Sequence, residues 1–458
     1  MRWHASGRHL AVALAVATVG AIAHQAVWGD TRMDSSAIHP LACDVTARVD
    51  PRDAPVLHAG WQKHAALRMN GAKGSLSTPA MFLFLSGTWP FSNAQMPYMV
   101  YMPERKRLLM SSEVGAGPVH TVLTSSDDFG VTWSAPRWMH TNAAGQPDFT
   151  CITGLSYLGS GKLIASSDTC WFSDDYGQTW GRPVPLPKSS DGKPLYSWDP
   201  VLVDKDAAGK VTRIAECRYF ENGTFDTPAY FSQACIHFSS DQGRTWSPEI
   251  VVPQWRGVNE IALARAKNGD MVAACRMDNP KQFLGLQNDQ YSGLATCVSH
   301  DNGRTWSALN KLFWWGRHHP DMVVMPNGDI VMTYVVRNGY TDASDGFPRF
   351  GVEAVISRDN GRTWDLDHKY LLASWTAKIK DTWWGSPQST TTLLLPDGAL
   401  LTAFGTGLRN VPTQTVCKMD VALVRWRLSG KPTNSDRTIG AVPFDSDLRN
   451  KFDPDSAR

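Results

Sequence analysis

Acidic and histidine side chains recur in this 458-residue chain at similar positions before Gly-centred turns. Glu260 and His319 each lie nine residues before the glycine of an Asn-Gly-Asp turn, and Asp199 and Asp148 open similar apolar segments earlier in the chain. Paired carboxylates, or a carboxylate beside a histidine, can perform general acid–base catalysis on a glycosidic bond. We therefore predict these four residues as the catalytic candidates.

Arginines end the second apolar segment of three consecutive units. The guanidinium group is a planar fork of donors that suits carboxylate, sulfate or phosphate, so convergent arginines predict a site for an anionic ligand. Tryptophans near the segment openings can stack against sugar rings; besides Trp198 these are Trp383 and Trp384. The predicted substrate-binding residues are Arg276, Arg317, Arg337, Arg218, His318, Trp198 and Gln95.

A metal site at His318 and His319, with Asp321 nearby, is the alternative use of these side chains. Adjacent residues of a strand point to opposite faces of a sheet, so the two histidines are not expected to bind one ion together. We predict neither a metal nor a cofactor.

The elements that position these residues are marked by a repeated eight-residue pattern, S-x-D-x-G-x-T-W. Serine, aspartate and glycine suit a tight turn, and the threonine and tryptophan that follow suit a half-buried strand. The pattern therefore predicts a hairpin turn with a structural role. Its five aspartates are Asp128, Asp175, Asp241, Asp301 and Asp359.

The aspartates of this pattern lie between 47 and 66 residues apart, the span of one four-stranded sheet with its loops. Six units follow one another, with Asn-Gly or Asp-Gly turns between apolar runs, and helical periodicity is nearly absent. We predict an all-β, six-bladed β-propeller with four-stranded antiparallel blades over residues 61–430. One of two early apolar stretches, 64–69 or 81–85, is expected to supply the outer strand of the last blade.

The N-terminal segment has the features of a signal peptide over residues 1–23. Arg2 and Arg8 precede an apolar run, which ends in Ala21-Ile22-Ala23. This run is short for a membrane span. We expect a secreted or periplasmic protein without a membrane span in the mature chain, with a leader at 24–60 and a polar tail at 431–458. An uncleaved anchor is the alternative.

Eight cysteines in an exported chain allow disulfides. Several lie on what we expect to be adjacent strands of one blade, and buried free thiols are the alternative. The pairings that we predict are Cys217–Cys235, Cys275–Cys297, Cys151–Cys170 and Cys43–Cys417. The formal net charge of +2 gives no sign of a nucleic-acid partner.

The repeated pattern, the number of units and the N-terminal segment resemble the sialidase superfamily of Asp-box (BNR-repeat) propellers, across roughly residues 90–430. The resemblance implies three arginines that grip a substrate carboxylate, a Tyr–Glu nucleophile and an acid/base Asp. Glu260 matches the family's Glu, Arg276 its second arginine and Arg317 its third. Gln95 stands where the first arginine is expected, and Ser386–Ser389 stand where the nucleophilic Tyr is expected.

Three hypotheses follow for the function. The resemblance implies an exported glycoside hydrolase that acts on a terminal, acidic sugar of a glycan, with Glu260 paired to Asp199 or Asp148. The first alternative is a non-catalytic, carbohydrate-binding propeller that uses the same arginines. The second alternative is a polysaccharide lyase with His319 as its base. The oligomeric state is left open.

Overall fold

The computed structural model describes residues 61–63, 69–70, 81–84, 94–114, 120–148, 151–181, 183–186, 188–224, 227–280, 283, 291–338, 349–366, 369–376, 386–410 and 417–428. Among the described residues the helical ones are the 3-10 turn η4 at Pro103–Arg105 and the single 3-10 residues Phe283 and Tyr291, and the other named elements are strands. None of the described helical residues forms a segment long and apolar enough to cross a membrane. The proposed signal peptide, the leader, the polar tail, Cys43, Trp383 and Trp384 lie outside the described residues.

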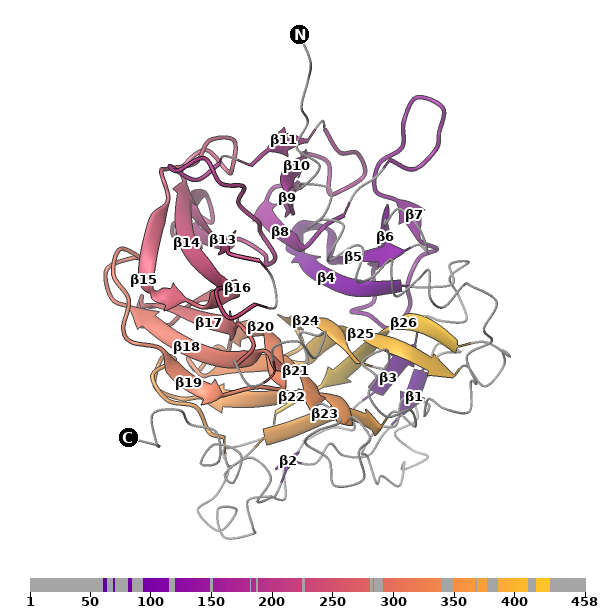
Figure 1. Ribbon diagram of the computed structural model, residues 1–458. Helices are drawn as coiled ribbons and strands as arrows, with labels where there is room; N and C mark the ends of the chain where they lie inside the picture. Colours follow the sequence, from indigo (N-terminus) through magenta and orange to yellow (C-terminus); the bar gives the residue numbers. More distant parts are fainter. Residues whose placement is uncertain are drawn as a thin grey trace.

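Six antiparallel sheets form the blades of a propeller around a central axis (Figure 1). Blade 1 is β4 (Ala94–Met102), β5 (Arg107–Val114), β6 (His120–Ser126) and β7 (Arg137–Trp138). Blade 2 is β8 (Gly154–Gly159), β9 (Lys162–Ser166), β10 (Thr169–Ser173) and β11 (Val184–Pro185). Blade 3 is β12 (Leu202–Lys205), β13 (Val211–Asn222), β14 (Phe231–Ser239) and β15 (Ile250–Arg256). Blade 4 is β16 (Val258–Arg265), β17 (Met271–Met277), β18 (Gly293–Ser299) and β19 (Asn310–Phe313).

The last two blades also take strands from the start of the chain. Blade 5 is β20 (Arg317–Val324), β21 (Ile330–Asn338), β22 (Arg349–Ser357) and β23 (Lys369–Thr376), with β2 (Met69–Asn70) at its edge. Blade 6 is β24 (Gln388–Leu394), β25 (Leu400–Asn410) and β26 (Cys417–Trp426), completed by β3 (Met81–Phe84) and β1 (Trp61–Lys63). The six-bladed prediction is confirmed. The stretch that supplies the outer strand of blade 6 is 81–84, which pairs with β26.

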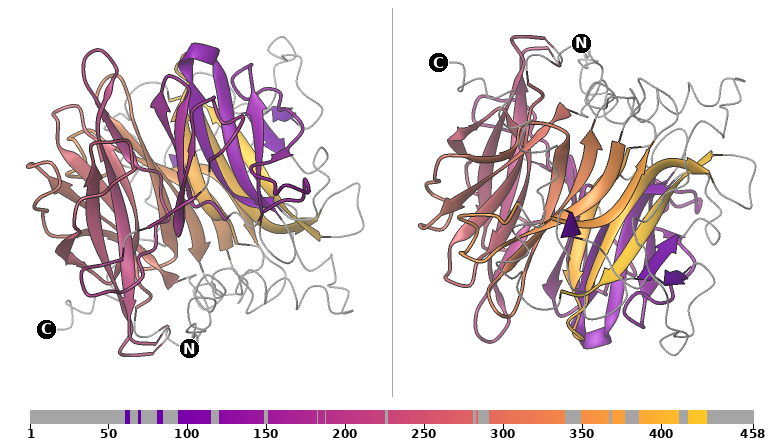
Figure 2. Two further views of the ribbon diagram at one scale, coloured as in Figure 1. Left: turned by 90° about the horizontal axis from the view of Figure 1, so that it is seen from above. Right: turned by 90° about the horizontal axis from the view of Figure 1, so that it is seen from below.

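Blades 6 and 1 lie side by side in both views of Figure 2, where the last strands (yellow) run beside the first (indigo to purple). Apolar side chains fill this junction; among them are Leu108 and Met110 of blade 1 and Leu401 and Leu423 of blade 6. The Thr391 hydroxyl of β24 also donates to the carbonyl of Pro97 in β4, over 2.8 Å. The ring is therefore closed by packing and by a hydrogen bond between its first and last blades.

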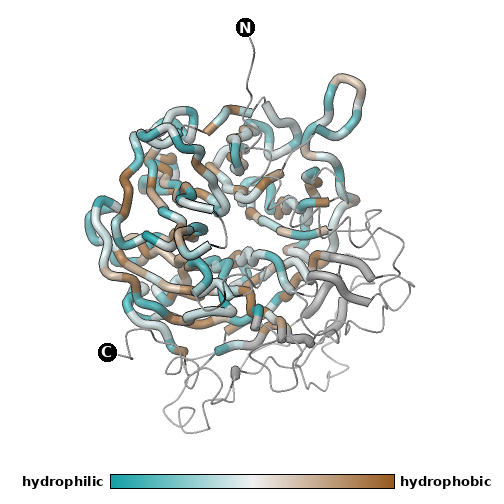
Figure 3. Tube along the Cα trace, in the orientation of Figure 1, coloured by the Kyte–Doolittle hydropathy of each residue, from teal (hydrophilic) through white to brown (hydrophobic). Residues whose placement is uncertain are grey.

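Apolar clusters also fill the junctions between the other neighbouring blades. Brown (hydrophobic) and teal (hydrophilic) stretches follow one another along the tube in Figure 3. Every residue of β17 and β18 is buried, because a blade packed between two neighbours is covered on both faces.

The five S-x-D-x-G-x-T-W turns share one hydrogen-bond pattern. In the turn of blade 1 the Ser126 hydroxyl donates to Asp128 Oδ1 over 2.8 Å and accepts the Gly130 N–H, and Asp128 Oδ1 accepts the Thr132 N–H over 2.8 Å. The same contacts occur in the other four turns. Each aspartate is thus used by its own turn, and the predicted structural role is confirmed.

Three of the predicted disulfides are not formed, because the six cysteines whose side chains the structure describes are free thiols. The fourth, Cys43–Cys417, lies outside the described side chains. Cys217 lies opposite Ile236, whereas Cys235 lies opposite Arg218. Neighbouring residues of a strand alternate between faces, so these two thiols point to opposite sides of the sheet. The pairing Cys217–Cys235 is therefore wrong for a geometric reason.

The other two described pairs are not disulfides either, although Cys275 and Cys297 do lie together as predicted. Cys275 and Cys297 are hydrogen-bonded thiols, and the Trp255 indole N–H lies 3.2 Å from Cys297 Sγ. Cys151 donates to Glu113 Oε1 over 2.7 Å instead of pairing with Cys170.

Candidate functional site

One end of the ring collects the starts of the first strands and the ends of the second strands; we call this end the mouth. Four of the first strands carry a β-bulge there, since their pairing register shifts at Gln95/Tyr98, Val258/Ile261, His318/Asp321 and Gln388/Thr390. Three non-glycine residues at these bulges have positive φ: Met96 (50°), His319 (46°) and Ser389 (38°). A bulge breaks the alternation of side chains and re-aims them. The mouth residues are therefore placed by irregular backbone.

Glu260 is the centre of a buried polar group at the mouth. Its Oε1 accepts from Arg276 Nη1 over 2.5 Å, and its Oε2 lies 2.6 Å from His319 Nδ1. All three side chains are buried. The structure thus brings together three residues that the sequence analysis selected: Glu260 and Arg276 from blade 4 and His319 from blade 5.

The ionisation of this group follows from its contacts. Burial alone would raise the pKa of Glu260, but the charges and hydrogen bonds of Arg276 and His319 outweigh it and lower this pKa to about 2. Burial lowers the pKa of His319 despite its contact with Glu260. A neutral ring that carries its proton on Nδ1 fits both neighbours, because Nε2 then faces Arg276 Nη1 at 3.4 Å as an acceptor.

Asp199, just before β12, has a raised pKa, in contrast to Glu260. Burial raises its pKa well above the usual range, and the negative charges of Glu260 and Asp321 raise it further. Its Oδ2 is buried without a hydrogen-bond partner among the described residues. The backbone carbonyl of Asp199 would lie 2.6 Å from a Cβ at Gly154, so a glycine lets the two blades approach here. The site therefore holds a protonated carboxyl near an ionised one.

The structure adds residues that the sequence analysis did not select as site residues. Tyr98 on β4 is buried and donates to the carbonyl of Trp198 over 3.3 Å. Burial raises its pKa, as do the nearby charges of Asp199, Glu260 and Glu113. The phenol therefore stays protonated beside both central carboxyls.

Two further carboxyls at the mouth, those of Glu113 and Asp321, have raised pKa values. Burial raises the pKa of Glu113 to about 7, against hydrogen bonds from Cys151 and Gln95. Burial raises the pKa of Asp321 to about 7 as well, although its oxygens accept the backbone N–H groups of Thr392 and Met322.

A signal for Tyr98 and Asp321 was present in the sequence. Met96-Pro97-Tyr98 and His319-Pro320-Asp321 align on their prolines, and Tyr98 and Asp321 each follow a bulge. Alignment on the glycine turns alone did not find this correspondence.

Gln95 and Arg337 also lie at the mouth. The Gln95 amide donates to Glu113 Oε2 over 3.4 Å. Arg337 is fully buried and donates to the Pro387 carbonyl and to Gln388 Oε1, each over 2.9 Å, and its charge contributes to lowering the pKa of His319.

The two adjacent histidines lie closer together than strand alternation predicts. The ring centroids of His318 and His319 are 4.6 Å apart, because the bulge breaks the alternation. Within the described residues no group of three or more His, Cys, Asp or Glu side chains is arranged to hold a metal ion.

Three other selected residues have contacts elsewhere. Arg218 is fully buried, donates through Nε to Glu216 over 2.8 Å and lies 4.5 Å above the Trp246 ring. Arg317 binds Glu353, with Nε 3.0 Å from Oε2. Asp148 is half-exposed and pairs with His140 over 2.7 Å. No described contact joins these three residues to Glu260.

Comparisons with known proteins agree with this architecture. Residues 159–365 match the family described as a BNR repeat-like domain. No curated protein matches the chain. Among solved structures, a protein of unknown function from Dyadobacter fermentans is similar, with 16% identity and a TM-score of 0.55, over 81% of this chain and 100% of that one.

Two sialidase structures are also similar. The NanB sialidase of Streptococcus pneumoniae has 10% identity and a TM-score of 0.50, over 83% of this chain and 73% of that one. A Trypanosoma rangeli sialidase has 14% identity and a TM-score of 0.47, over 81% of this chain and 60% of that one. At these identities the likeness to the Dyadobacter and Streptococcus structures establishes the fold alone.

Proposed function

We propose that this chain, a six-bladed propeller that matches a BNR repeat-like domain over residues 159–365, is a glycoside hydrolase of the sialidase-like kind. The proposed substrate is a terminal, acidic sugar of a glycan. We also propose that the protein is exported, on the basis of its N-terminal segment.

The observation that carries the proposal is the pair Glu260 and Asp199. Their environments move the two pKa values in opposite directions: Glu260 down to about 2, and Asp199 well up. Two carboxyls held in different protonation states are what glycoside hydrolysis needs, one as acid and one as base, nucleophile or charge stabiliser. A pure anion-binding site gains nothing from a buried, ionised Glu260.

The proposed reaction assigns one role to each group. Asp199 gives its proton to the leaving glycosidic oxygen as the bond to the anomeric carbon breaks. Glu260, fixed by Arg276 and His319, stabilises the positive charge that develops on the sugar. Water then adds to the anomeric carbon, and its proton passes to a carboxylate: Asp199 if the reaction retains the configuration, Glu260 if it inverts.

Two guanidinium groups near His319 support an acidic sugar. The charges of Arg276 and Arg337, together with that of Glu260, act on its ring. Guanidinium groups bind carboxylates through paired N–H donors, so these two are the proposed contacts for a substrate carboxylate.

The test is a hydrolysis screen of the purified protein against chromogenic sugars, with sialosides and uronides included. Glu260→Gln keeps the size of the side chain and removes its charge, so turnover should fall by about 10²-fold or more. Glu249→Gln, at the surface, is the matched control and should keep wild-type activity. Unchanged turnover in Glu260→Gln would remove this residue from the mechanism.

The same screen separates the alternatives. An unsaturated product that absorbs in the ultraviolet would indicate a lyase, with neutral His319 as the base. No product from any sugar, together with glycan-array binding that is lost in Arg276→Ala, would make the chain a binding propeller.

A further inference from the structure

Asp199, the proposed acid, lies on a segment that forms no strand. Residues 196–200 connect blades 2 and 3, and β12 begins only at Leu202. Tyr196 makes a single bridge to Tyr219 of β13, with N···O distances of 2.9 and 3.0 Å. The position of Asp199 therefore depends on contacts other than the ladder of a sheet.

Side chains from three blades hold this segment. Thr153, just before β8 of blade 2, donates through its hydroxyl to the Ser197 carbonyl over 2.6 Å. Tyr98 of blade 1 donates to the Trp198 carbonyl over 3.3 Å, and the Trp198 side chain packs against the apolar clusters on both sides. Glu216 of blade 3 accepts from the Ser197 hydroxyl over 2.7 Å. Ser197 is thus held through both its carbonyl and its hydroxyl.

The Ser197 hydroxyl leads to a buried ion pair. Glu216 Oε1 accepts this hydroxyl, while Glu216 Oε2 accepts from Arg218 through Nε over 2.8 Å and through Nη2. Both charged side chains are buried. A buried ion pair is weak evidence of stabilisation, because the desolvation of two charges offsets much of their attraction. Here the pair also fixes an acceptor for Ser197, two residues before Asp199.

The Asp199 carboxyl extends from this segment to blade 4. It accepts the backbone N–H of Ile261, the residue after Glu260. The titratable and charged groups that act on it or respond to it are Tyr98, Cys217, Glu260, Cys275, Arg276 and Asp321. A displacement of residues 196–199 would move the carboxyl relative to all of these groups.

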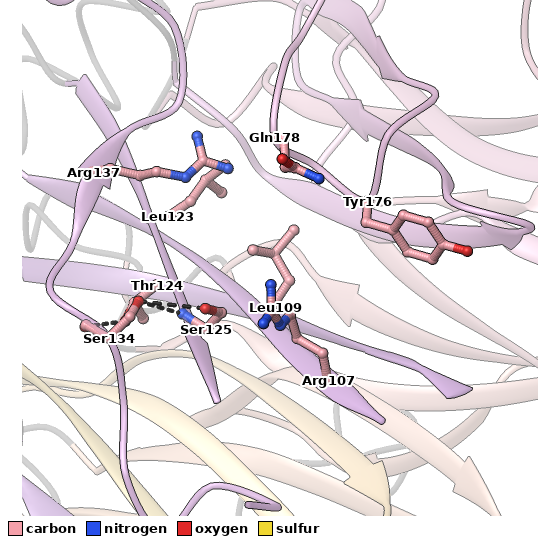
Figure 4. Close-up of a pocket in the computed structure, with 9 residues that line it drawn as sticks. All are labelled: Arg107, Leu109, Leu123, Thr124, Ser125, Ser134, Arg137, Tyr176 and Gln178. Carbon is pink, nitrogen blue, oxygen red and sulfur yellow. Dashed lines mark hydrogen bonds between the residues drawn. The ribbon is translucent and has the colours of Figure 1, made fainter. Parts of the chain in front are cut away.

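Hydroxyls at the other end of the ring are bonded within their own blade. In the hollow between blades 1 and 2 in Figure 4, the Thr124 hydroxyl donates to the Ser134 carbonyl over 2.7 Å, and Ser125 Oγ lies 3.4 Å from Ser134 Oγ. The Ser197 hydroxyl instead connects an irregular segment to a carboxylate that an arginine holds in place. Such a supporting contact is what keeps a site residue in one orientation.

We propose that Ser197 and Glu216 are positioning residues of Asp199. Glu216, fixed by Arg218, holds the Ser197 hydroxyl, and Ser197 holds the backbone that carries the acid. Neither residue touches the sugar. The inference rests on the proposed hydrolase, whose acid is Asp199, and it gives Arg218 a role different from the substrate contact that the sequence analysis predicts.

The test compares Ser197→Ala with the wild type on the chromogenic sialoside or uronide that the wild type hydrolyses. The variant loses the bond to Glu216, so the acid is less well oriented, and kcat should fall about tenfold or more while KM stays within about twofold. The alkaline limb of the pH profile should move to lower pH, because a looser segment lets water reach the Asp199 carboxyl and lowers its pKa. Ser197→Thr keeps the hydroxyl and should keep kcat within a few-fold of wild type.

Ser239→Ala is the matched control. The Ser239 hydroxyl is buried and donates to Asp241 over 2.7 Å, as long as the Ser197 bond, but it lies in the turn at the opposite end of blade 3. Its kcat and pH profile should equal those of the wild type. If Ser197→Ala folds poorly, Thr153→Val removes the other hydroxyl contact to Ser197 and should lower kcat in the same way. A wild-type kcat with an unchanged alkaline limb would overturn the proposal, as would equal losses in Ser197→Ala and Ser239→Ala.

An infrared titration separates this proposal from the hydrolase itself. A protonated carboxyl absorbs apart from a carboxylate, and the band that Asp199→Asn removes belongs to Asp199. In Ser197→Ala this band should disappear at a lower pH than in the wild type, and in Ser239→Ala at the same pH. No hydrolysis by the wild type would count against the proposed function, whereas the same titration in the wild type and both variants would overturn the positioning role.

Discussion

At the scale of the residue, the mouth holds two carboxyls of the same chemistry, and their different neighbours give them different pKa values. Glu260 has a guanidinium and an imidazole within 2.6 Å of its oxygens, whereas the strongest charges that act on Asp199 are the negative ones of Glu260 and Asp321. Desolvation penalises the charged form of both. The partners decide which carboxyl keeps its charge, and this difference is the basis of the proposed acid–base roles.

Asp199→Asn tests the role of the acid. The amide cannot donate the proton that the leaving oxygen needs, so kcat should fall by about 10²-fold or more. In the wild type, activity should be present below the raised pKa of Asp199 and fall as the pH rises through it. The variant should lose this alkaline limb of the pH profile.

Asp148→Asn is the control for this variant, since Asp148 is half-exposed beside His140 and makes no described contact with Glu260. Its activity should stay within a few-fold of wild type. A larger loss in Asp148→Asn than in Asp199→Asn would assign the acid to Asp148 instead.

The sequence predicts some of the site and misses the rest for a structural reason. Glu260 and His319 both lie nine residues before a turn glycine, and the structure places them in contact. The count worked because the first strands of these two blades have the same length before their turns. It missed Tyr98, and it also selected Arg218, which binds Glu216. Bulges shift the register at the start of the first strands, and a constant strand count cannot show on which face a residue then lies.

At the scale of the element, the fold was predictable because five blades contain the same turn, which is stabilised by contacts among its own residues. The S-x-D-x-G-x-T-W turn needs only its own residues, as the shared contacts of Asp128 and its counterparts show. The disulfides were not predictable in the same way. Cys217 and Cys235 could pair only if they lay on the same face of the sheet. The face depends on how β13 and β14 are aligned, and a shift of one residue, which the sequence spacing does not reveal, reverses it.

The glycine of the repeated turn has two structural roles, and a pair of variants separates them. Gly361 has φ +84°, and a Cβ there would lie 2.6 Å from both methyl groups of Val272 in the neighbouring blade. Gly209 has φ +79° with open space around it. Ala at either position should cost about 1–2 kcal/mol for the left-handed backbone. Gly361→Ala should cost about 1–3 kcal/mol more, because the β-branched Val272 cannot rotate away easily.

Denaturant unfolding of both variants measures the difference. The midpoint should fall more for Gly361→Ala than for Gly209→Ala at an unchanged slope. Equal losses would mean that the turn glycine serves the backbone alone and that the blades can adjust to the added methyl group.

At the scale of the whole molecule, the propeller contains two sets of carboxyls, one with raised and one with lowered pKa values. Burial raises the pKa of Glu113 and of Asp321 to about 7, so the folded protein favours their protonated forms. Glu260 and the turn aspartates respond in the opposite way, since their pKa values are lowered, to about 2 for Glu260, Asp241 and Asp301. The same fold is therefore weakened by acid through one set of carboxyls and by base through the other.

The free energy of unfolding should consequently be highest near pH 5. Stability from Glu113 and Asp321 is fully present below their unfolded pKa values of about 4 and is lost as the pH rises to about 7, by roughly 3 kcal/mol for Glu113 and roughly 4 kcal/mol for Asp321 at ~1.4 kcal/mol per pKa unit. Stability from Glu260 is present above about pH 4.5 and is lost as the pH falls toward 2. Denaturant titrations from pH 3 to pH 8 measure both limbs. Glu113→Gln removes one titrating group without changing its size and should flatten the limb between pH 5 and 7, while stability that rises steadily from pH 5 to 8 would contradict the burial of these carboxyls.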